Sequence, residues 1–186
     1  MPLGLLVAQL EVPPAFEDEF NDWYDTEHIP ERLRVPGFLS ARRLERVARP
    51  RYLNLYDLTD LAVLDSAAYL AVSGANKSPW TARVTKHCKS LGRRLYVQTS
   101  GEEVVCASHP FTILARYAKA SIDQALLAAL RELDGVSARS FAGREHVDGE
   151  AFICATAIDE AHAERVRASF AGLDVEVYGP YARRLT

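Results

Sequence analysis

The residues best suited to chemistry lie together in one short stretch, FNDWYDTEHIP at positions 20–30. Its histidine, His28, has the side chain whose unperturbed pKa lies inside the physiological range, so it can take or give a proton near neutral pH. Trp23 and Tyr24 precede it at helical spacing. Pro30 predicts that the helix ends at or near His28, because a proline disfavours the α conformation of the residue before it. A histidine at a helix end beside aromatic rings indicates a pocket rather than a solvated surface.

Asp25 is the carboxylate expected to orient His28 or to stabilise its charge, since it lies three residues earlier on the same helix. Glu27 or Glu31 could take that part if the turn bends differently. A helix C-terminus also favours the imidazolium form, by about 0.3–1 kcal/mol. Tyr24, four residues before His28, shares its face and could offer a hydroxyl to the same ligand. The alternative is a surface or capping histidine, with the aromatic rings serving only the core.

The strand expected at 52–58, YLNLYDL, carries polar groups on a face that should be apolar. Alternation puts its first two leucines on one face and Tyr52, Asn54 and Tyr56 on the other. The leucine face suits helices, so the Tyr/Asn face is expected to look into a cavity. The alternative for the tyrosines is half-polar packing at an interface.

Arg42 and Arg43 are adjacent on the strand expected at 38–47, so they lie on opposite faces. One of the two is therefore expected to point inward, where a guanidinium could anchor an anionic group. Which one does so stays open, and a structural salt bridge is the alternative for either.

Alternating segments of strand and helix type must position these side chains. In the first half, residues 3–12, 38–47, 52–58 and 91–99 have strand character, and residues 15–28, 62–72 and 79–90 have helical character. This order is β-α-β-β-α-β, the ferredoxin-like unit. After a linker at 100–110 the order returns, with strands at 111–118, 136–143, 151–157 and 174–178 and helices at 122–133 and 160–170.

The predicted fold is therefore α+β, with one ferredoxin-like unit at 1–100 and a second at 101–186. Each four-stranded sheet covers one face with its own helices and leaves the other face needing cover. We expect the two open faces to pack sheet to sheet, so that one chain forms a pseudodimeric α+β barrel. A cavity between the sheets is then the expected binding location.

Composition excludes several classes of function. The net charge of −3 argues against a nucleic-acid footprint, which needs a basic face. The three cysteines, Cys88, Cys106 and Cys154, form no CxxC pair, and no metal, phosphate-loop or nucleophile motif is found. The apolar opening is too short for a membrane span and lacks a basic leader. We expect a cytoplasmic protein without a metal site, which could pair again into a homodimer of pseudodimers.

Three segments together, WYDTEHIP, VPGFLSARRLE and YLNLYDL, resemble the EthD-like group of the dimeric α+β barrel superfamily. The resemblance covers about residues 3–100; the second half resembles the same fold only by its element order. Relatives in this superfamily include cofactor-free monooxygenases, polyketide cyclases, isomerases, decarboxylases or dehydratases, and some haem binders. The resemblance implies that His28 is the acid/base residue of a cavity, with Trp23 and Tyr24 beside it.

The leading hypothesis is an enzyme that acts without a cofactor on a small aromatic, polyketide-like or lactone-like metabolite, as an isomerase, lyase or monooxygenase. His28, aided by Asp25, would move a proton next to a carbonyl, and a tyrosine or arginine would hold the developing oxyanion. The alternatives are a non-catalytic module that binds a hydrophobic ligand, a haem binder that uses a cavity histidine, and a purely structural tandem module.

Overall fold

The structure, a computed structural model, describes residues 2–49, 51–101, 109–117, 124–147, 149–170 and 172–182. Its eight strands form a closed antiparallel barrel with the neighbour order β1-β3-β2-β8-β5-β7-β6-β4. The strands are β1 (Gly4–Glu11), β2 (Phe38–Glu45), β3 (Tyr52–Leu58), β4 (Lys89–Ser100), β5 (Phe111–Tyr117), β6 (Val136–Arg144), β7 (Ala151–Ala157) and β8 (Asp174–Pro180).

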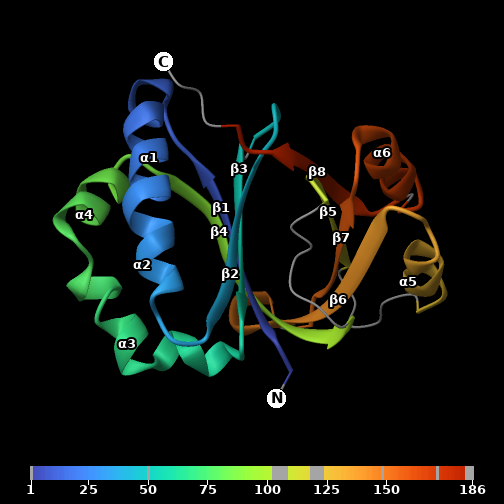
Figure 1. The fold of residues 1–186 in the computed structure, drawn as a ribbon, viewed down its shortest axis with the longest axis horizontal. Helices are drawn as coiled ribbons and strands as arrows, with labels where there is room; N and C mark the ends of the chain where they lie inside the picture. Colours follow the sequence, from blue (N-terminus) through green and yellow to red (C-terminus); the bar gives the residue numbers. More distant parts are fainter. Residues whose placement is uncertain are drawn as a thin grey trace.

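Helices cover the barrel on two opposite sides (Figure 1). On the first side lie α1 (Glu17–Trp23), the π turn η2 (Tyr24–His28), α2 (Ile29–Leu33), α3 (Ala67–Leu70) and α4 (Pro79–Thr85). On the second side lie α5 (Gln124–Arg131) and α6 (Glu160–Ala168). Short 3-10 turns complete the connections: η1 (Pro14–Phe16), η3 (Leu61–Asp65), η4 (Gly74–Asn76) and η5 (Glu145–Val147). The predicted α+β class is confirmed.

The barrel closes through its edges, which corrects the expectation of two separate sheets that only face each other. Strand β2 pairs with β8 through Leu44–Pro180 and Glu45–Gly179, and β4 pairs with β6 over a longer stretch. Strands β1 to β4 thus form one arc of a continuous wall, and β5 to β8 form the other. The joined edges leave no unpaired strand between the arcs, which removes the hazard of an open edge.

Several predicted boundaries moved. The helix predicted at 15–28 continues to residue 33, and the helix predicted at 79–90 stops at residue 85, because β4 already begins at Lys89. The helix predicted at 62–72 is split by Ser66, whose hydroxyl accepts a hydrogen bond from the Tyr69 amide and so starts a new helix. The predicted linker at 100–110 lies largely outside the described residues, as does Cys106.

Apolar side chains form three layers, and their assignment reverses the predicted faces of β3. Tyr52 and Tyr56 pack under the first-side helices, whereas Leu53 and Leu55 point into the barrel. All seven residues of β3 are buried, so alternation alone does not distinguish the helix-facing side from the barrel-facing side. The third layer lies between β5 to β8 and helices α5 and α6.

Among the described residues, packed side chains occupy the barrel interior where a chamber between the sheets was predicted. Tyr96 stacks on Phe152 with ring centroids 4.7 Å apart. Toward one end the Arg139 guanidinium donates to Asp57 at 2.7 Å, and Asp57 is completely buried. A second polar cluster surrounds Glu176, whose carboxylate accepts hydrogen bonds from Gln9, Arg46 and Arg116.

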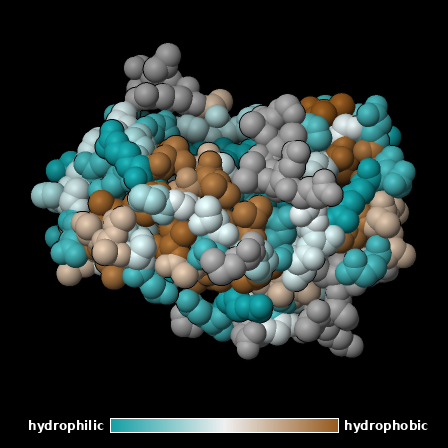
Figure 2. Space-filling model, turned by 60° about the horizontal axis from the view of Figure 1, so that its bottom comes forward, coloured by the Kyte–Doolittle hydropathy of each residue, from teal (hydrophilic) through white to brown (hydrophobic). Residues whose placement is uncertain are grey.

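Apolar side chains also reach the surface at the base of the first side. Leu33, Leu39 and Leu70 are each about half exposed, where α2 ends, β2 begins and α3 ends. Figure 2, which brings the bottom of the molecule forward, shows hydrophobic residues between hydrophilic ones on this face. Of the described helices, none is both long and apolar enough to span a membrane.

Candidate functional site

A π turn carries the helix past the proline that was expected to end it. The amide of Ile29 donates to the carbonyl of Tyr24, five residues back, instead of four. Pro30 has no amide to donate, and its ring would press on a carbonyl of a regular α-helix. The wider turn relieves both problems, so α2 continues to Leu33. Such single π turns are frequently found at functional sites.

The same turn brings His28 against the two aromatic rings before it. The Trp23 and His28 ring centroids lie 4.5 Å apart, and those of Tyr24 and His28 lie 4.9 Å apart in an edge-on arrangement. Residues five apart do not share a face of a regular helix with 3.6 residues per turn. The π turn is therefore what places Trp23 beside His28.

These three side chains line a cavity of about 260 Å³ between the first-side helices and the outer face of the barrel. Residues of β1 and β3 form the floor of this cavity, and residues of the first-side helices and of β4 form its walls. Besides those three, the lining residues are Leu6, Ala8, Leu10, Arg32, Tyr56, Tyr69, Thr85, Ser90 and Arg93. The cavity thus lies on the helix side of a single arc, and the expectation that His28 faces the space between two sheets is wrong.

His28 is neutral at physiological pH. Burial, and secondarily the positive charges of Arg32 and Arg43, lower its pKa to about 3. Its Nδ1 is buried and has no hydrogen-bond partner among the described residues. The expected imidazolium at a helix C-terminus is not found, because the helix continues and burial disfavours charge.

A pair of phenols lies beside the imidazole. The Tyr56 hydroxyl donates to the Tyr24 hydroxyl at 3.4 Å, and both side chains are almost completely buried. Burial raises the pKa of Tyr24 to about 12 and raises the pKa of Tyr56 well above its usual value. Both therefore remain protonated, and together they form a hydrogen-bonding pair within the cavity wall.

Asp25 pairs with Arg43 instead of His28. Its Oδ1 accepts from Arg43 Nη1 at 2.5 Å, and its Oδ2 accepts from the Tyr181 hydroxyl at 3.4 Å. The predicted Asp25–His28 pair is therefore not formed. The Arg43 guanidinium lies 4.7 Å from the centre of the Tyr24 ring, so it packs against a side chain of the cavity wall without lining the cavity itself.

The sequence left open which of Arg42 and Arg43 points inward, and their hydrogen-bond partners show where each side chain lies. Arg43 lies on the helix side of β2, whereas Arg42 donates to the His109 carbonyl. Asn54 is buried and donates to the carbonyl of Ala8 at 3.5 Å. None of these three residues lines the cavity. Of the predicted site residues, Trp23, Tyr24, His28 and Tyr56 do.

Glu27 has a structural role that fixes the tryptophan. Its Oε1 accepts from Ser78 at 2.5 Å and from Thr81 at 3.2 Å, both at the start of α4. Thr81 in turn accepts from Trp23 Nε1 at 3.0 Å. This chain of hydrogen bonds ties α4 to the π turn and sets the orientation of the Trp23 ring.

Two arginines of the cavity were missed in the sequence. Arg32 lies four residues after His28, so a helix continued past Pro30 would have placed it on the same face. Its guanidinium lies 5.1 Å above the Tyr69 ring and donates to the Val72 carbonyl at 3.0 Å. Arg93 reaches the cavity from β4 and is exposed. No sequence signal marked Arg93.

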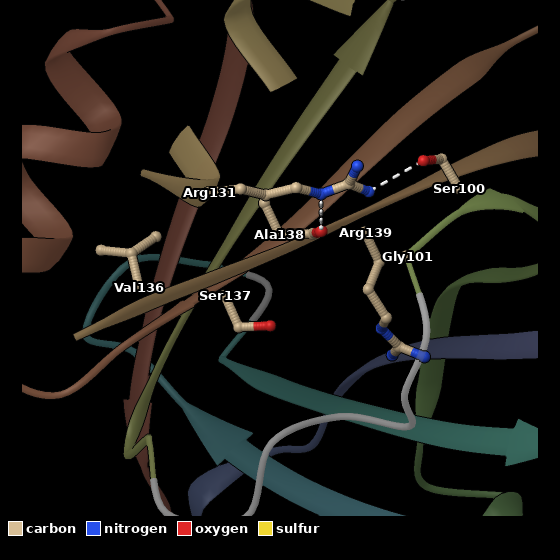
Figure 3. Close-up of a pocket in the computed structure, with 7 residues that line it drawn as sticks. All are labelled: Ser100, Gly101, Arg131, Val136, Ser137, Ala138 and Arg139. Carbon is tan, nitrogen blue, oxygen red and sulfur yellow. Dashed lines mark hydrogen bonds between the residues drawn. The ribbon is translucent and has the colours of Figure 1, made fainter. Parts of the chain in front are cut away.

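A second and larger pocket, of about 450 Å³, opens beside β6 (Figure 3). Arg131 crosses it and donates to the Ala138 carbonyl at 3.0 Å and to the Ser100 hydroxyl at 2.9 Å. The described lining residues include no histidine, cysteine, methionine or tyrosine. Among the described residues of the whole chain, no cluster of histidine, cysteine or carboxylate side chains could hold a metal ion.

Comparison by sequence finds no matching family model and no matching curated protein. Comparison by structure finds proteins that share the whole fold. A candidate chlorite dismutase aligns with a TM-score of 0.69 at 8% identity, over 98% of this chain and 96% of the other. An anthrone oxidase-like protein aligns with a TM-score of 0.60 at 14% identity, over 97% and 92%. A haem-binding protein from Thermus thermophilus aligns with a TM-score of 0.60 at 11% identity, over 96% and 90%.

The haem-binding neighbour contradicts the expectation that a protein of this kind uses no cofactor. The donor chemistry at His28 fits haem, because neutral imidazole is the form that ligates iron. The volume fits less well, since pockets for drug-sized ligands span about 300–1,000 Å³ and this cavity measures about 260 Å³. A porphyrin would enter only if the helix layer moved outward. At these identities the likeness is one of fold, and the chain has the fold of the chlorite dismutase-like and dimeric α+β barrel proteins.

Proposed function

We propose that the protein is an enzyme that binds a small, largely aromatic molecule in the His28 cavity and moves a proton on it. One observation carries the proposal: a neutral imidazole whose buried Nδ1 has no partner among the described residues lines a cavity walled by aromatic rings. A buried polar atom without a partner costs about 1–3 kcal/mol, so its persistence calls for an explanation. A ligand that changes the surroundings of the imidazole would provide one.

The cavity offers groups for both sides of a proton transfer next to a carbonyl. His28 is unprotonated and can accept a proton, although a pKa of about 3 makes it a weak base in the free protein. An anionic ligand or intermediate within about 4–6 Å would raise that pKa toward the working pH. The Tyr24–Tyr56 pair stays protonated and can donate to a developing oxyanion. An isomerase or lyase type of reaction follows from this set, with a monooxygenase as the alternative.

We propose a supporting role for Asp25 and Arg43. Their ion pair braces Tyr24 from behind, and Asn21 reinforces it by accepting from Arg43 at 2.7 Å. Asp25 would therefore act on the cavity through Arg43 and Tyr24, without touching the ligand.

We also propose that residues 1–100 and 101–186 are two ferredoxin-like units of EthD-like kind, and that only the first carries a site. The neighbour order within each arc supports this, since β4-β1-β3-β2 and β8-β5-β7-β6 are the same arrangement read in chain order. The aromatic-histidine-proline segment, on which the resemblance rests, occurs only in the first.

The test uses a library of aromatic and lactone-like metabolites with Trp23 as the reporter. The chain has two tryptophans, so Trp80→Phe leaves Trp23 as the only one. Compounds that change its fluorescence are then assayed for conversion. His28→Gln is expected to lower turnover by roughly 10²–10⁴-fold, the usual worth of a positioned acid/base group. His162→Gln is the matched control, because His162 pairs with Asp159 on the exposed helix α6. Unchanged turnover in His28→Gln, at an intact fold, would refute the proposal.

Haem binding at His28 is the second candidate, and the neutral imidazole without a partner among the described residues is what favours it. Titration with haemin, followed by the Soret absorbance, tests it directly. The expected result is a band that shifts on binding and is lost in His28→Ala but kept in His162→Gln. Binding that is indifferent to His28 would reject this candidate.

A further inference from the structure

The cavity carries positive charge that nothing on its described lining neutralises. Arg32 is buried, with 6% of its surface exposed, and it lines the cavity together with Arg93. No aspartate or glutamate is among the described lining residues. A buried guanidinium is normally paired, because removing an unpaired charge from water is costly.

The partners of Arg32 leave part of its guanidinium unused. Its Nη2 donates to the Val72 carbonyl at 3.0 Å and forms an ion pair with Glu31 at 3.7 Å, a distance too long for a good hydrogen bond. Its Nη1 is buried and has no partner among the described residues. Two further acids lie in the π turn: Asp25 pairs with Arg43, and Glu27 accepts hydrogen bonds from Ser78 and Thr81 at the start of α4.

The other groups of the site respond to the same positive field. Arg32 and Arg43 lower the pKa of His28 and also oppose the rise in the pKa of Tyr24 and Tyr56. Each effect favours negative charge in the cavity. Arg93, exposed at its edge, adds to the attraction of an anion from solution.

The volume and the walls limit the shape of that anion. About 260 Å³ lies at or below the small end of ligand pockets, so one ring fits better than a fused system. The rings of Trp23, Tyr24 and Tyr69 can pack against a planar ligand, and Leu6 and Leu10 supply an apolar floor. A compact, flat body with one charged end satisfies both conditions.

We propose that the cavity takes a small planar carboxylate, of the size of a single-ring aromatic acid, and that Arg32 binds its carboxylate while Arg93 helps at the entrance. This inference rests on the proposed function, because it assumes that the His28 cavity is the binding site. It adds the charge class and size of the substrate, and it assigns a binding role to two residues outside the aromatic-histidine segment.

Benzoate and benzamide form the test pair, because they match in shape and differ in charge. Binding is followed through Trp23 fluorescence in the Trp80→Phe background. We expect benzoate to bind more tightly than benzamide by about 10-fold or more, since hydrogen bonds to charged groups contribute more than neutral ones. Arg32→Gln is expected to remove that preference, and Arg93→Gln is expected to weaken benzoate binding mainly at low salt.

Two further variants keep the outcome interpretable. Arg32→Lys retains the charge and is expected to retain part of the preference, which guards against a folding defect in Arg32→Gln. Ala8→Leu fills the cavity floor and is expected to abolish binding of both compounds. Equal affinity for the two compounds, or a preference that survives Arg32→Gln, would overturn the carboxylate assignment while leaving the site intact. Benzoate binding that survives Ala8→Leu would instead refute the site, and with it the proposed function.

Discussion

The two helix-covered sides of this barrel are packed in different ways. On the first side, the buried residues between helices and strands include Phe20, Trp23, Tyr24, Tyr52 and Tyr56. On the second side the corresponding layer is built mainly from small and aliphatic residues, with one buried phenylalanine among the described residues. Its buried members are Ile113, Ala115, Leu127, Leu130, Ala138, Ile153, Ala155, Ala157, Ala163, Val166 and Phe170.

The difference in side chains affects how closely the helices of each layer can pack on the strands. Alanine on the strands lets a helix approach closely, and leucine, isoleucine and valine fill the remaining space in common rotamers. On the first side large rings meet edge to face, as Tyr24 does with Trp23 and with Phe20. The cavity of about 260 Å³ lies in the aromatic layer.

The helices of the two sides also differ in their regularity. The first-side helix contains the π turn Tyr24–His28, whereas α5 and α6 are α-helical over the residues described. The π turn aligns Trp23 with His28, and it contributes Tyr24 and His28 to the cavity lining. The second side has its pocket beside β6, with Arg131 and Arg139 among the lining residues, whereas the first side has its cavity within the aromatic layer.

The largest expected effect compares a leucine in each layer. Leu130→Ala should lower the free energy of unfolding by about 2–5 kcal/mol, because Leu130 is fully packed on the second side. Leu10→Ala should cost less than about 2 kcal/mol, since Leu10 already borders an open space and loses fewer contacts. Urea unfolding of both variants measures the difference. Equal costs would mean that the first layer is as tightly packed as the second.

The pH dependence of stability should come from the first side. The pKa of His28 is lowered to about 3 in the folded chain, so below its unfolded value the unfolded chain binds a proton that the native chain does not. Stability is therefore full above about pH 6.5 and falls as the pH drops, by about 2 kcal/mol at pH 5.

His28→Phe should lack this contribution, while His162→Gln, on the second side, should retain it. The measurement is the difference in unfolding free energy between each variant and the parent protein, taken from pH 7 to pH 5. A His28→Phe difference that stays constant over this range would show that the imidazole is not held neutral by burial.

The third prediction compares the stability cost of placing a larger side chain in each layer. Ala155→Leu should cost about 1–3 kcal/mol, because Ala155 is completely buried in the alanine-rich layer. Ala8→Leu should cost less than about 1 kcal/mol, since its side chain extends into the cavity. Thermal unfolding gives both values. Comparable losses would mean that Ala8 is as tightly surrounded as Ala155.

The sequence predicted the element order, because strand alternation, turn residues and helical spacing are local signals. It also assigned Trp23, Tyr24, His28 and Tyr56 to one cavity, although to a cavity between the sheets rather than under the helices. It did not predict that the helix passes Pro30, because no local pattern indicated the π turn that accommodates the proline. That single error hid Arg32 and led to the expectation of a charged His28. The hydrogen bonds that join Glu27 and Trp23 to Thr81 come from a distant helix and have no local signal either.

The position of the cavity could not be read from periodicity either. Every residue of β3 is buried, so both of its faces look like core. Which face meets helices depends on barrel closure through β2–β8 and β4–β6, contacts between residues far apart in the chain. Asp25 was assigned to His28 by spacing alone, whereas its partner Arg43 comes from a strand.

The smallest expected effect concerns the hydrogen bond that orients the aromatic wall. Trp23→Phe removes the bond from Trp23 Nε1 to Thr81 and should cost about 0.5–1.5 kcal/mol beyond the change in ring size. Trp80→Phe is the matched control, because its Nε1 donates at 3.2 Å to Glu19 in a more exposed place and should cost little. A double-mutant cycle of Trp23→Phe with Thr81→Val isolates the interaction. A coupling energy near zero would mean that α4 does not hold the ring, and that the edge of the first-side layer is set by the π turn alone.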